Sequence, residues 1–319
     1  MSRQAYPFDP SYGYTLADLL KIAAPEEPTD FAKFWTRAYA EAMRVASRPE
    51  IRDTGRDEGG WRIFDLSYRS TDEFTIGGWL LAPVDGAVRR GFVIGHGYAG
   101  RDAPDLDLPF RNAALLFPCF RGMSRSRRNP ISPETRWHVL HDIHKRDRYI
   151  HRGCVQDVWL AVSALLRLFP QTEGRIGYLG ISLGGGIGAM ALPWDNRLRG
   201  AHLNVPSLGN QPLRLRLPTL GSAASVQRFQ EELGGRWNVL ETLRYYDAAI
   251  AARRIRVPVH CACALSDPYV APPGQFAIYN SLGGPKELFI LDAGHTEQQP
   301  TEAQARKLKE TINRFFANL

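Results

Sequence analysis

Residues 177–188 have the sequence Gly-Tyr-Leu-Gly-Ile-Ser-Leu-Gly-Gly-Gly-Ile-Gly, and this stretch decides the fold. The mostly apolar run from Arg175 to Gly180 predicts a buried strand, and the run from Leu183 to Leu192 predicts a helix. The Gly-x-Ser-x-Gly motif therefore falls on a tight strand-to-helix turn, where glycines remove the clashes that a Cβ would cause. Such a turn holds Ser182 in a strained conformation and presents its hydroxyl at the carboxyl edge of a sheet.

The motif by itself does not decide the chemistry. In a chain of this length with 29 glycines it arises by chance in about one sequence in eight, so an ordinary serine in a glycine-rich turn is the alternative. A serine hydroxyl is a weak nucleophile at neutral pH, and it needs a histidine base whose tautomer and charge a carboxylate stabilises. In the α/β-hydrolase fold these groups follow one another along the chain as Ser, then Asp or Glu, then His.

Two later strand ends supply these partners. Residues 288–297 begin as an apolar strand and continue into a Gly-His turn, which makes His295 the candidate base. Residues 257–268 form another mostly apolar strand that runs into an aspartate followed by proline, so Asp267 is the candidate orienting acid; a solvated turn aspartate is the alternative. Asp292 competes for this role, but it lies only three residues before His295. We therefore predict a triad of Ser182, Asp267 and His295.

The oxyanion hole is expected to come from the backbone. In this fold it combines the N–H after the serine with a second N–H from the loop after an earlier strand. The apolar run 91–95 is followed by a His-Gly-Tyr turn, so the predicted donors are the N–H groups of Leu183 and Tyr98. His96 in the same turn is expected to bond neighbouring backbone rather than to act as a base or a metal ligand.

Four further segments carry a family resemblance. TDFAKFW at 29–35 is similar to a TDFxxFW motif, and GGWLLAP at 77–83 is similar to a second hairpin strand. The segments 245–259 and 272–280, which flank Asp267, are similar to YFDxxNxAxxIKVPV and PPSTxFAAYN. In these features the chain resembles the acetyl xylan esterases and cephalosporin C deacetylases of the α/β-hydrolase superfamily. The resemblance covers most of the chain, and it implies an acetyl ester substrate and a homo-oligomer.

Some positions depart from the family pattern. Met123 stands where the family's Arg-Gly-Gln has its glutamine, and Leu183 stands where Gly-x-Ser-Gln-Gly has one. Residues 205–210, Val-Pro-Ser-Leu-Gly-Asn, differ from the family's VPFLCDF. The change at position 183 need not harm the oxyanion hole, because the donor there is a backbone group. The resemblance implies substrate-binding roles for Tyr98, Arg121 and Pro206.

Length and composition fit one large catalytic domain. At 319 residues and 44% apolar content the chain can bury a substantial core, and strands alternate with helices from about residue 60 onward. This alternation predicts an α/β-hydrolase fold, a doubly wound and mostly parallel sheet with helices on both faces. Residues 1–60 are expected to form a helical and hairpin extension packed on the core, with helices at 16–22 and 31–45, the second capped by Thr29 or Asp30. Residues 61–319 are expected to form the catalytic domain of what is a single structural domain overall.

Composition also bears on the compartment. No stretch approaches the roughly 20 apolar residues of a membrane span, and residues 1–10 lack the apolar core of a secretory signal, so we expect a cytoplasmic protein with no membrane partner. Cys261 and Cys263 lie two apart on one face of a predicted strand, where they cannot easily form a disulfide. All four cysteines, which also include Cys119 and Cys154, are expected to be small buried apolar groups.

The net charge of +7 is concentrated in one segment. From Arg111 to Arg152 there are ten basic residues against three acidic ones. No nucleic-acid partner is expected, because no recognised binding motif accompanies the charge. No metal is expected either, since the helical spacing of His138, His141, His144 and His151 suits one helix face as well as coordination. A solvated insertion over the active-site edge is the first interpretation, and contact with an anionic substrate or an acidic subunit is the second.

These observations predict a serine esterase that acts on small-molecule acyl esters, most simply acetyl esters of a sugar or similar alcohol, without a cofactor. A general carboxylesterase or a peptidase-like acyl hydrolase is the alternative within the superfamily, since this scaffold hosts many reactions. A non-catalytic binding protein is the alternative of another class. The ordered Ser, Asp and His argue against it, because a binder has no need of all three.

Overall fold

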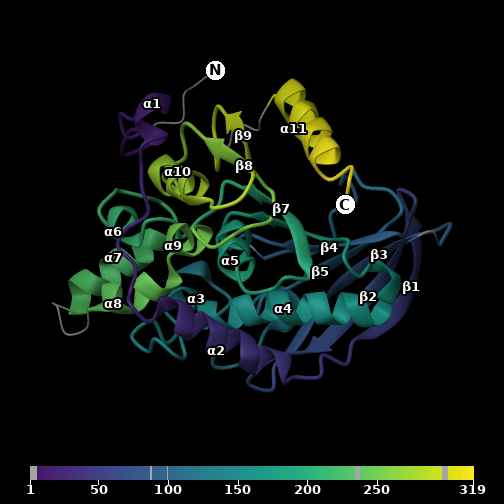
Figure 1. The fold of residues 1–319 in the computed structure, drawn as a ribbon. Helices are drawn as coiled ribbons and strands as arrows, with labels where there is room; N and C mark the ends of the chain where they lie inside the picture. Colours follow the sequence, from purple (N-terminus) through teal and green to yellow (C-terminus); the bar gives the residue numbers. More distant parts are fainter. Residues whose placement is uncertain (1–5, 87, 99, 234–237, 297–300) are drawn as a thin grey trace.

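The computed structural model describes residues 6–86, 88–98, 100–233, 238–296 and 301–319, and it contains a nine-stranded sheet (Figure 1). Residues 1–5 of the stretch considered for a secretory signal lie outside the described part. The strand order across the sheet is β1-β2-β3-β5-β4-β6-β7-β8-β9. The strands are β1 (Glu50–Glu58), β2 (Trp61–Arg69), β3 (Thr75–Pro83), β4 (Arg90–Gly95), β5 (Ala113–Pro118), β6 (Ile176–Ile181), β7 (Leu198–Asn204), β8 (Val259–Ala264) and β9 (Lys286–Leu291).

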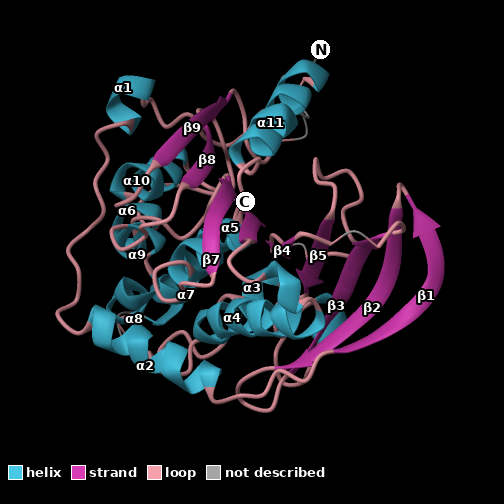
Figure 2. Ribbon diagram, turned by 45° about the vertical axis from the view of Figure 1, so that its right-hand side comes forward, coloured by secondary structure: helices cyan, strands magenta, loops and turns pink. Residues whose placement is uncertain are grey.

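The sheet has an antiparallel end and a parallel remainder. Strands β1, β2, β3 and β5 pair antiparallel, and all pairings from β5 through β4 to β9 are parallel. Figure 2 shows β1 to β3 as long curved strands at one end of the molecule. This architecture confirms the predicted α/β-hydrolase fold, with its mostly parallel sheet.

Both faces of the sheet are buried because apolar residues fill both sides of each central strand. In β4, Val93 belongs to the main core, whereas Phe92 and Ile94 belong to a second core on the opposite face. Side chains alternate between the two faces of a strand, so a continuous apolar run requires cover on each side. The cover on the second face includes helix α11 (Glu302–Phe315) and Phe316, whose ring meets Phe92 edge-on at 5.1 Å.

Helices α2, α4 and α5 cover the first face (Figures 1 and 2). Helix α4 runs along the sheet and packs on β4, β5 and α5. Buried aromatic contacts join α2 to it, because Trp35 and Trp159 meet edge-on at 6.2 Å. Besides α11, the described helices are α1 (Leu16–Leu19), α2 (Phe31–Met43), α3 (Thr135–His138), α4 (Ile150–Leu168), α5 (Leu183–Ala191), α6 (Gln211–Arg214), α7 (Ser222–Leu233), α8 (Val239–Leu243), α9 (Ala248–Ala252) and α10 (Pro272–Ser281), with short 3-10 turns at Ser124–Ser126, Pro170–Thr172 and Arg244–Tyr246.

The sheet begins before residue 60, the boundary that the sequence suggests between the extension and the catalytic domain. Residues 1–60 contain β1, which pairs with β2 across a turn at Gly59 and Gly60, so the sheet begins before the predicted catalytic domain. Strand β1 is almost entirely exposed and has no apolar alternation. It is held instead by its hydrogen-bonded partner and by a salt bridge of 3.0 Å from Arg62 to Asp57 across the hairpin.

The second N-terminal helix begins where predicted, but its predicted cap is absent. Asp30 is the residue before α2, and its side chain makes no hydrogen bond to the first turn. Its carboxylate accepts hydrogen bonds from the Tyr245 hydroxyl and from Arg146 instead. Asp30 therefore ties the N-terminal segment to Tyr245 and Arg146.

The expectation for the cysteines agrees with the structure. All four cysteines are free and buried. None of the helices that the structure describes is both long enough and apolar enough to cross a bilayer.

Candidate active site

Ser182 lies on the tight turn between β6 and α5. Its backbone has φ 55° and ψ −114°, a conformation that a non-glycine residue rarely adopts. The flanking glycines are required sterically: a Cβ at Gly180 would lie 2.4 Å from the carbonyl oxygen of Gly184, and a Cβ at Gly184 would lie 2.7 Å from the carbonyl carbon of Gly95. The Ser182 N–H donates to Asn204 O on the neighbouring strand at 2.9 Å, which anchors the strained turn.

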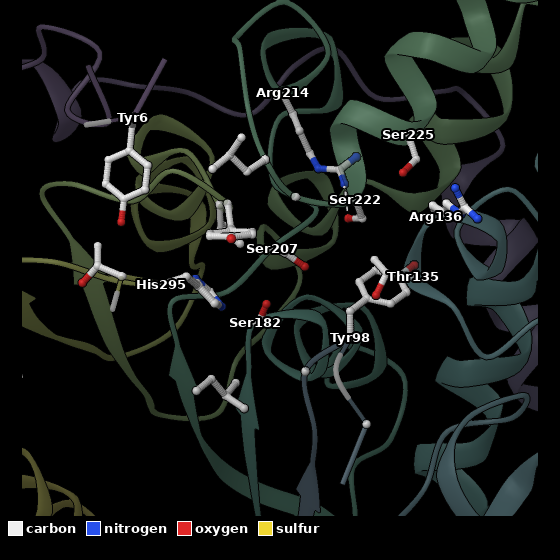
Figure 3. Close-up of a pocket in the computed structure, with 18 of the residues that line it drawn as sticks. Tyr6, Tyr98, Thr135, Arg136, Ser182, Ser207, Arg214, Ser222, Ser225 and His295 are labelled. Carbon is white, nitrogen blue, oxygen red and sulfur yellow. Dashed lines mark hydrogen bonds between the residues drawn. The ribbon is translucent and has the colours of Figure 1, made fainter. Parts of the chain in front are cut away.

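His295 and Asp267 meet as the sequence predicts. The Nδ1 atom of His295 lies 2.8 Å from Oδ2 of Asp267. Asp267 is completely buried, and its other oxygen, Oδ1, accepts the N–H groups of Tyr269 and Val270, both at 2.9 Å. With both carboxylate oxygens engaged, Nδ1 of His295 carries the proton and Nε2 is free to accept one. Figure 3 shows the imidazole and the Ser182 hydroxyl pointing toward one another.

Asp292 does not compete for this role in the structure. It is exposed, and its Oδ2 accepts a hydrogen bond of 3.2 Å from Gln304 on α11. Of the two acids, Asp267 is the one that contacts the His295 ring.

The backbone beside Ser182 has the arrangement that an oxyanion hole needs. Leu183 is the first residue of α5, and the first N–H groups of a helix have no carbonyl partner within it. The turn after β4 lies directly against the serine, since a Cβ at Gly97 would come within 3.5 Å of Ser182 Cβ. The N–H groups predicted as donors, those of Leu183 and Tyr98, therefore belong to segments on two sides of Ser182.

His96 has a structural role, as expected. Its Nε2 accepts the Phe120 N–H at 2.9 Å, so Nδ1 carries the proton and donates to Gly97 O at 2.7 Å. Burial lowers the pKa of His96 to about 3, and the ring stays neutral. It fixes the turn that carries Tyr98.

A cavity of about 980 Å³ connects Ser182 and His295 with several other segments (Figure 3). Residues Tyr6 and Pro7 form part of its wall, and this segment is tied to the site by the Asp267 N–H, which donates to Pro10 O at 2.9 Å. Helices α3, α6 and α7 supply further walls. The described lining residues are Tyr6, Pro7, Gly97, Tyr98, Gly100, Thr135, Arg136, Ile181, Ser182, Ser207, Arg214, Leu220, Gly221, Ser222, Ser225, Arg228, Tyr269, Val270, His295 and Thr296.

Tyr98 lines this cavity, in agreement with its predicted place at the site. Its hydroxyl lies 2.6 Å from Nε2 of His151, and its ring meets that of His138 edge-on at 5.7 Å. These contacts fix the ring against the wall. Two of the four histidines considered for a metal site are thus used for packing and hydrogen bonding. Among the residues that the structure describes, no group of three or more potential ligands is arranged to hold a metal ion.

The structure places Arg121, a predicted substrate-binding residue, away from the cavity that holds Ser182. Arg121 is only 3% exposed and does not line the cavity. Its Nη2 donates to Asp157 on α4 at 2.7 Å, and its Nη1 donates to Asp72 in the β2–β3 turn at 3.0 Å. The guanidinium is therefore a structural cation that joins the antiparallel end of the sheet to α4.

Pro206 and the Leu183 side chain are also placed elsewhere. Pro206 is buried against α5, because a Cβ at Gly185 would lie 2.8 Å from its Cα; the next residue, Ser207, lines the cavity instead. Leu183 is fully buried in the main core, and Met123 belongs to the same core. The residues that replace the family's glutamines thus turn away from the cavity.

The basic segment 111–152 does not form a cationic edge over the active site. Most of its charges are paired with acids, several of them on other segments. Arg125 bonds Asp65 on β2, and Arg152 bonds Glu41 on α2. The only residue of this segment among the described arginines of the cavity is Arg136, which also forms a 3.0 Å salt bridge with Glu134.

The sequence did not identify the polar residues between β7 and α8 that face the nucleophile. Ser207, Arg214 and Ser222 all line the cavity. Their segment has short helices and irregular turns, so no apolar periodicity indicates which side chains point inward. Their position in the sequence could have indicated these residues, because the segment follows β7, the neighbour of the strand that leads into Ser182.

Comparison with known proteins agrees with this geometry. The family model for acetyl xylan esterase (AXE1) matches residues 16–313. The chain belongs to the acetyl xylan esterase family. As a member of this family it is a carboxylic ester hydrolase.

Solved structures show how widely the fold is shared. An acetyl xylan esterase from Paenibacillus sp. R4 is similar with a TM-score of 0.81 and 24% identity, over 95% of this chain and 99% of that one. Acetyl xylan esterase 1 from Thermoanaerobacterium sp. JW/SL YS485 gives 0.80 and 19%, over 96% and 99%. The acylaminoacyl peptidase of Pyrococcus horikoshii gives 0.63 and 18%, over 81% of this chain and 41% of that one. At these identities the likeness concerns the fold.

Proposed function

We propose that this acetyl xylan esterase family member removes acetyl groups from a carbohydrate or similar alcohol by a Ser-His-Asp acyl-enzyme mechanism. The observation that carries the proposal is the 2.8 Å contact between His295 Nδ1 and the buried Asp267 carboxylate. This contact leaves Nε2 as the proton acceptor on the side that faces Ser182 (Figure 3).

The first half-reaction forms the acyl-enzyme. Nε2 of His295 accepts the hydroxyl proton while Ser182 Oγ attacks the ester carbonyl carbon. The resulting imidazolium is stabilised by Asp267, which stays ionised. The negative charge on the carbonyl oxygen is stabilised by the N–H groups of Leu183 and Tyr98, and His295 then returns its proton to the departing alcohol.

The second half-reaction restores the enzyme. A water molecule gives a proton to Nε2 of His295 and attacks the acetyl carbonyl, and the tetrahedral intermediate collapses to acetate and free Ser182. Every proton transfer in this scheme passes through one imidazole, so no cofactor is required.

The cavity supports a large alcohol rather than a minimal ester. Its volume of about 980 Å³ lies near the upper end of ordinary ligand pockets, about 300–1,000 Å³. Its lining includes Thr135, Ser207, Ser222 and Ser225, whose hydroxyls can bond the hydroxyls of a sugar. An acetyl group alone would leave most of this space empty.

The proposal is tested by covalent labelling and by substrate choice. A fluorophosphonate probe should label Ser182, and the label should disappear in Ser182→Ala, whose kcat on an activated acetate ester should fall by about 10⁴-fold or more. Ser281→Ala, which removes a hydroxyl at the end of α10, serves as the control and should label like the unmodified protein.

A panel of acetylated sugars and longer-chain esters then defines the substrate. Release of acetate from acetylated sugars is the expected activity. Substantial activity in folded Ser182→Ala protein, with an unchanged circular dichroism spectrum, would exclude the mechanism. Failure of the unmodified protein to react with the probe would favour a non-catalytic binding protein.

A further inference from the structure

The active-site cavity has a one-sided charge. Three arginines line it, Arg136, Arg214 and Arg228, and none of its described lining residues is an aspartate or a glutamate. Low-dielectric walls that carry one sign of charge focus the field and raise the local concentration of ions of opposite sign. The cavity that holds Ser182 therefore attracts anions.

Arg214 is the arginine of the cavity best placed to bind an anion. It lies at the end of α6 and extends into the cavity, where its Nη2 donates to Ser222 Oγ at 2.8 Å (Figure 3). Its Nη1 donates to Gln211 Oε1 at 3.1 Å. Both partners are neutral, and no described carboxylate lies within 4.0 Å of its guanidinium. Arg121 and Arg197, two other arginines withdrawn from solvent, each have a carboxylate partner.

Burial makes this unpaired charge costly. Burial lowers the pKa of Arg214 below its ordinary value, although the group stays cationic. A cation withdrawn from water is stabilised best by a charged partner that also accepts its hydrogen bonds. The described residues supply two neutral acceptors, so an anion that enters the cavity would gain from the remaining N–H donors of the fork.

The nearest acid is not available as that partner. Asp247 contributes to the field at Arg214, but its carboxylate accepts the N–H groups of Gln211 at 2.6 Å and Ala249 at 2.9 Å. It is fully buried, and burial raises its pKa to about 6. Asp247 therefore holds α6 and α9 together and leaves the guanidinium unpaired.

The other two arginines of the cavity are less suited to bind an anion. Arg136 is exposed and already paired with Glu134 at 3.0 Å. Arg228 lies exposed on α7. Both add to the positive potential, but exposed charges are screened over about 8 Å at physiological ionic strength. Arg214 is the least exposed of the three, since its side chain is partly buried.

We propose that Arg214 forms a subsite for an anionic group, a carboxylate or a phosphate, on the alcohol part of the ester substrate. This rests on the proposed esterase function, because the subsite shares its cavity with Ser182 and His295. The guanidinium fork would donate hydrogen bonds to two oxygens of such a group, and the hydroxyl of Ser222, which accepts from Nη2, would hold the fork in place. The anion-bearing esters would then be selected over neutral ones of the same size.

The test compares substrates that differ only in charge. The methyl glycoside of tri-O-acetylated glucuronic acid is offered as the free acid and as its uronamide, which is neutral and nearly isosteric. A third substrate, the acetylated methyl glucoside 6-phosphate, separates phosphate from carboxylate recognition. Acetate release is measured at 20 mM and 500 mM NaCl, and the ratio of kcat/KM for anion over amide is the readout. We expect a ratio of at least about tenfold for one of the anions at low salt, because a hydrogen-bonded charge pair contributes on that scale.

Variants assign the preference to one residue. Arg214→Gln should reduce the ratio to about one, and Arg214→Lys should retain part of it as a point charge. Arg216→Gln is the matched control: it removes the same charge two residues away, where the exposed Arg216 bonds Pro212 O outside the cavity, and it should leave the ratio unchanged. An equal loss in Arg216→Gln would assign the preference to the general field and overturn the proposal.

Two readouts keep this proposal separate from the esterase assignment. A ratio near one for both anions in the unmodified enzyme, with normal turnover of the amide, would overturn the anion subsite and leave the esterase function standing. Binding of the deacetylated methyl glucuronoside and its amide to Ser182→Ala protein, followed by calorimetry, tests the subsite without turnover. Equal affinity for acid and amide there would overturn the subsite as well, whereas tighter binding of the acid that is lost in the Ser182→Ala, Arg214→Gln double variant would support it.

Discussion

Asp267→Asn separates the role of charge from the role of shape in this site. The substitution keeps the size of the side chain and removes one acceptor. Asp267 Oδ1 accepts two backbone N–H groups, from Tyr269 and Val270, and Oδ2 faces His295 Nδ1 and Gln275 Nε2. The two backbone donors select the rotamer in which the asparagine oxygen replaces Oδ1. The amide NH₂ then faces His295.

An NH₂ group at this position forces the wrong tautomer. The imidazole must accept at Nδ1, which places its proton on Nε2, where it can no longer take the proton of Ser182. The same NH₂ also faces the donor Nε2 of Gln275, whose bond to Asp267 is 3.2 Å in the native protein. We expect kcat to fall by about 10³- to 10⁴-fold, equivalent to about 4–5.5 kcal/mol of transition-state stabilisation, as for tautomer loss in other triads.

The assay is initial-rate hydrolysis of p-nitrophenyl acetate at pH 7.5, with the thermal midpoint recorded for each variant. Asp292→Asn is the matched control, because Asp292 is exposed and its carboxylate accepts a hydrogen bond from Gln304 on α11. It should retain activity within a few-fold. The reasoning is refuted if folded Asp267→Asn keeps more than a tenth of the native kcat, or if Asp292→Asn loses as much.

Two further predictions concern acyl length and acid stability. The Tyr98 ring, fixed by its bond to His151, should restrict the acyl side, so butyrate and longer p-nitrophenyl esters should lose at least about tenfold in kcat/KM relative to acetate, and Tyr98→Ala should narrow that gap; rates that rise steadily from acetate to octanoate would contradict it. Acid should unfold the protein between about pH 5 and 4. Burial lowers the pKa of four histidines to about 3 or 4: His96, His138, His202 and His260. Below pH 6.5 the unfolded chain therefore binds protons that the folded chain does not. The stability that is present above pH 6.5 is lost as pH falls. The raised pKa of Asp247, about 6, acts in the opposite direction, but it involves one proton against at least four on the histidines, so stability is lost as pH falls through this range. Native circular dichroism at pH 3 would contradict this prediction.

The positions of the three candidate triad residues were predictable because each residue follows a strand in the parallel part of the sheet. Ser182, Asp267 and His295 come after β6, β8 and β9, and parallel strands bring their carboxyl ends to one edge. Strand and turn patterns are local signals, so the sequence indicates these positions without knowledge of the packing.

Side-chain partners across the fold were not predictable in the same way. Arg121 is neutralised by Asp157 and Asp72, which lie 36 and 49 residues away along the chain. Nothing local distinguishes a guanidinium that meets a buried carboxylate from one that faces a ligand. The reverse holds for Arg214, whose short helix α6 has no periodicity that would indicate its direction. Strand β1 was hard to predict for a third reason. Its pairing with β2 makes it a strand, and it has no apolar face that the sequence would reveal.

The Asp267 N–H donates to Pro10 O, and Tyr6 and Pro7 lie in the cavity wall. These contacts constrain the order in which the parts of the site can form. A chain is made from its N-terminus toward its C-terminus, so Tyr6, Pro7 and Pro10 are made more than 250 residues before Asp267, with which Pro10 forms its hydrogen bond. Contacts between such distant residues form slowly, because a long loop must close first. A nascent chain that has already folded its Ser182 turn still has neither base nor wall. In the mechanism proposed above, hydrolysis therefore requires that the chain has been made as far as His295.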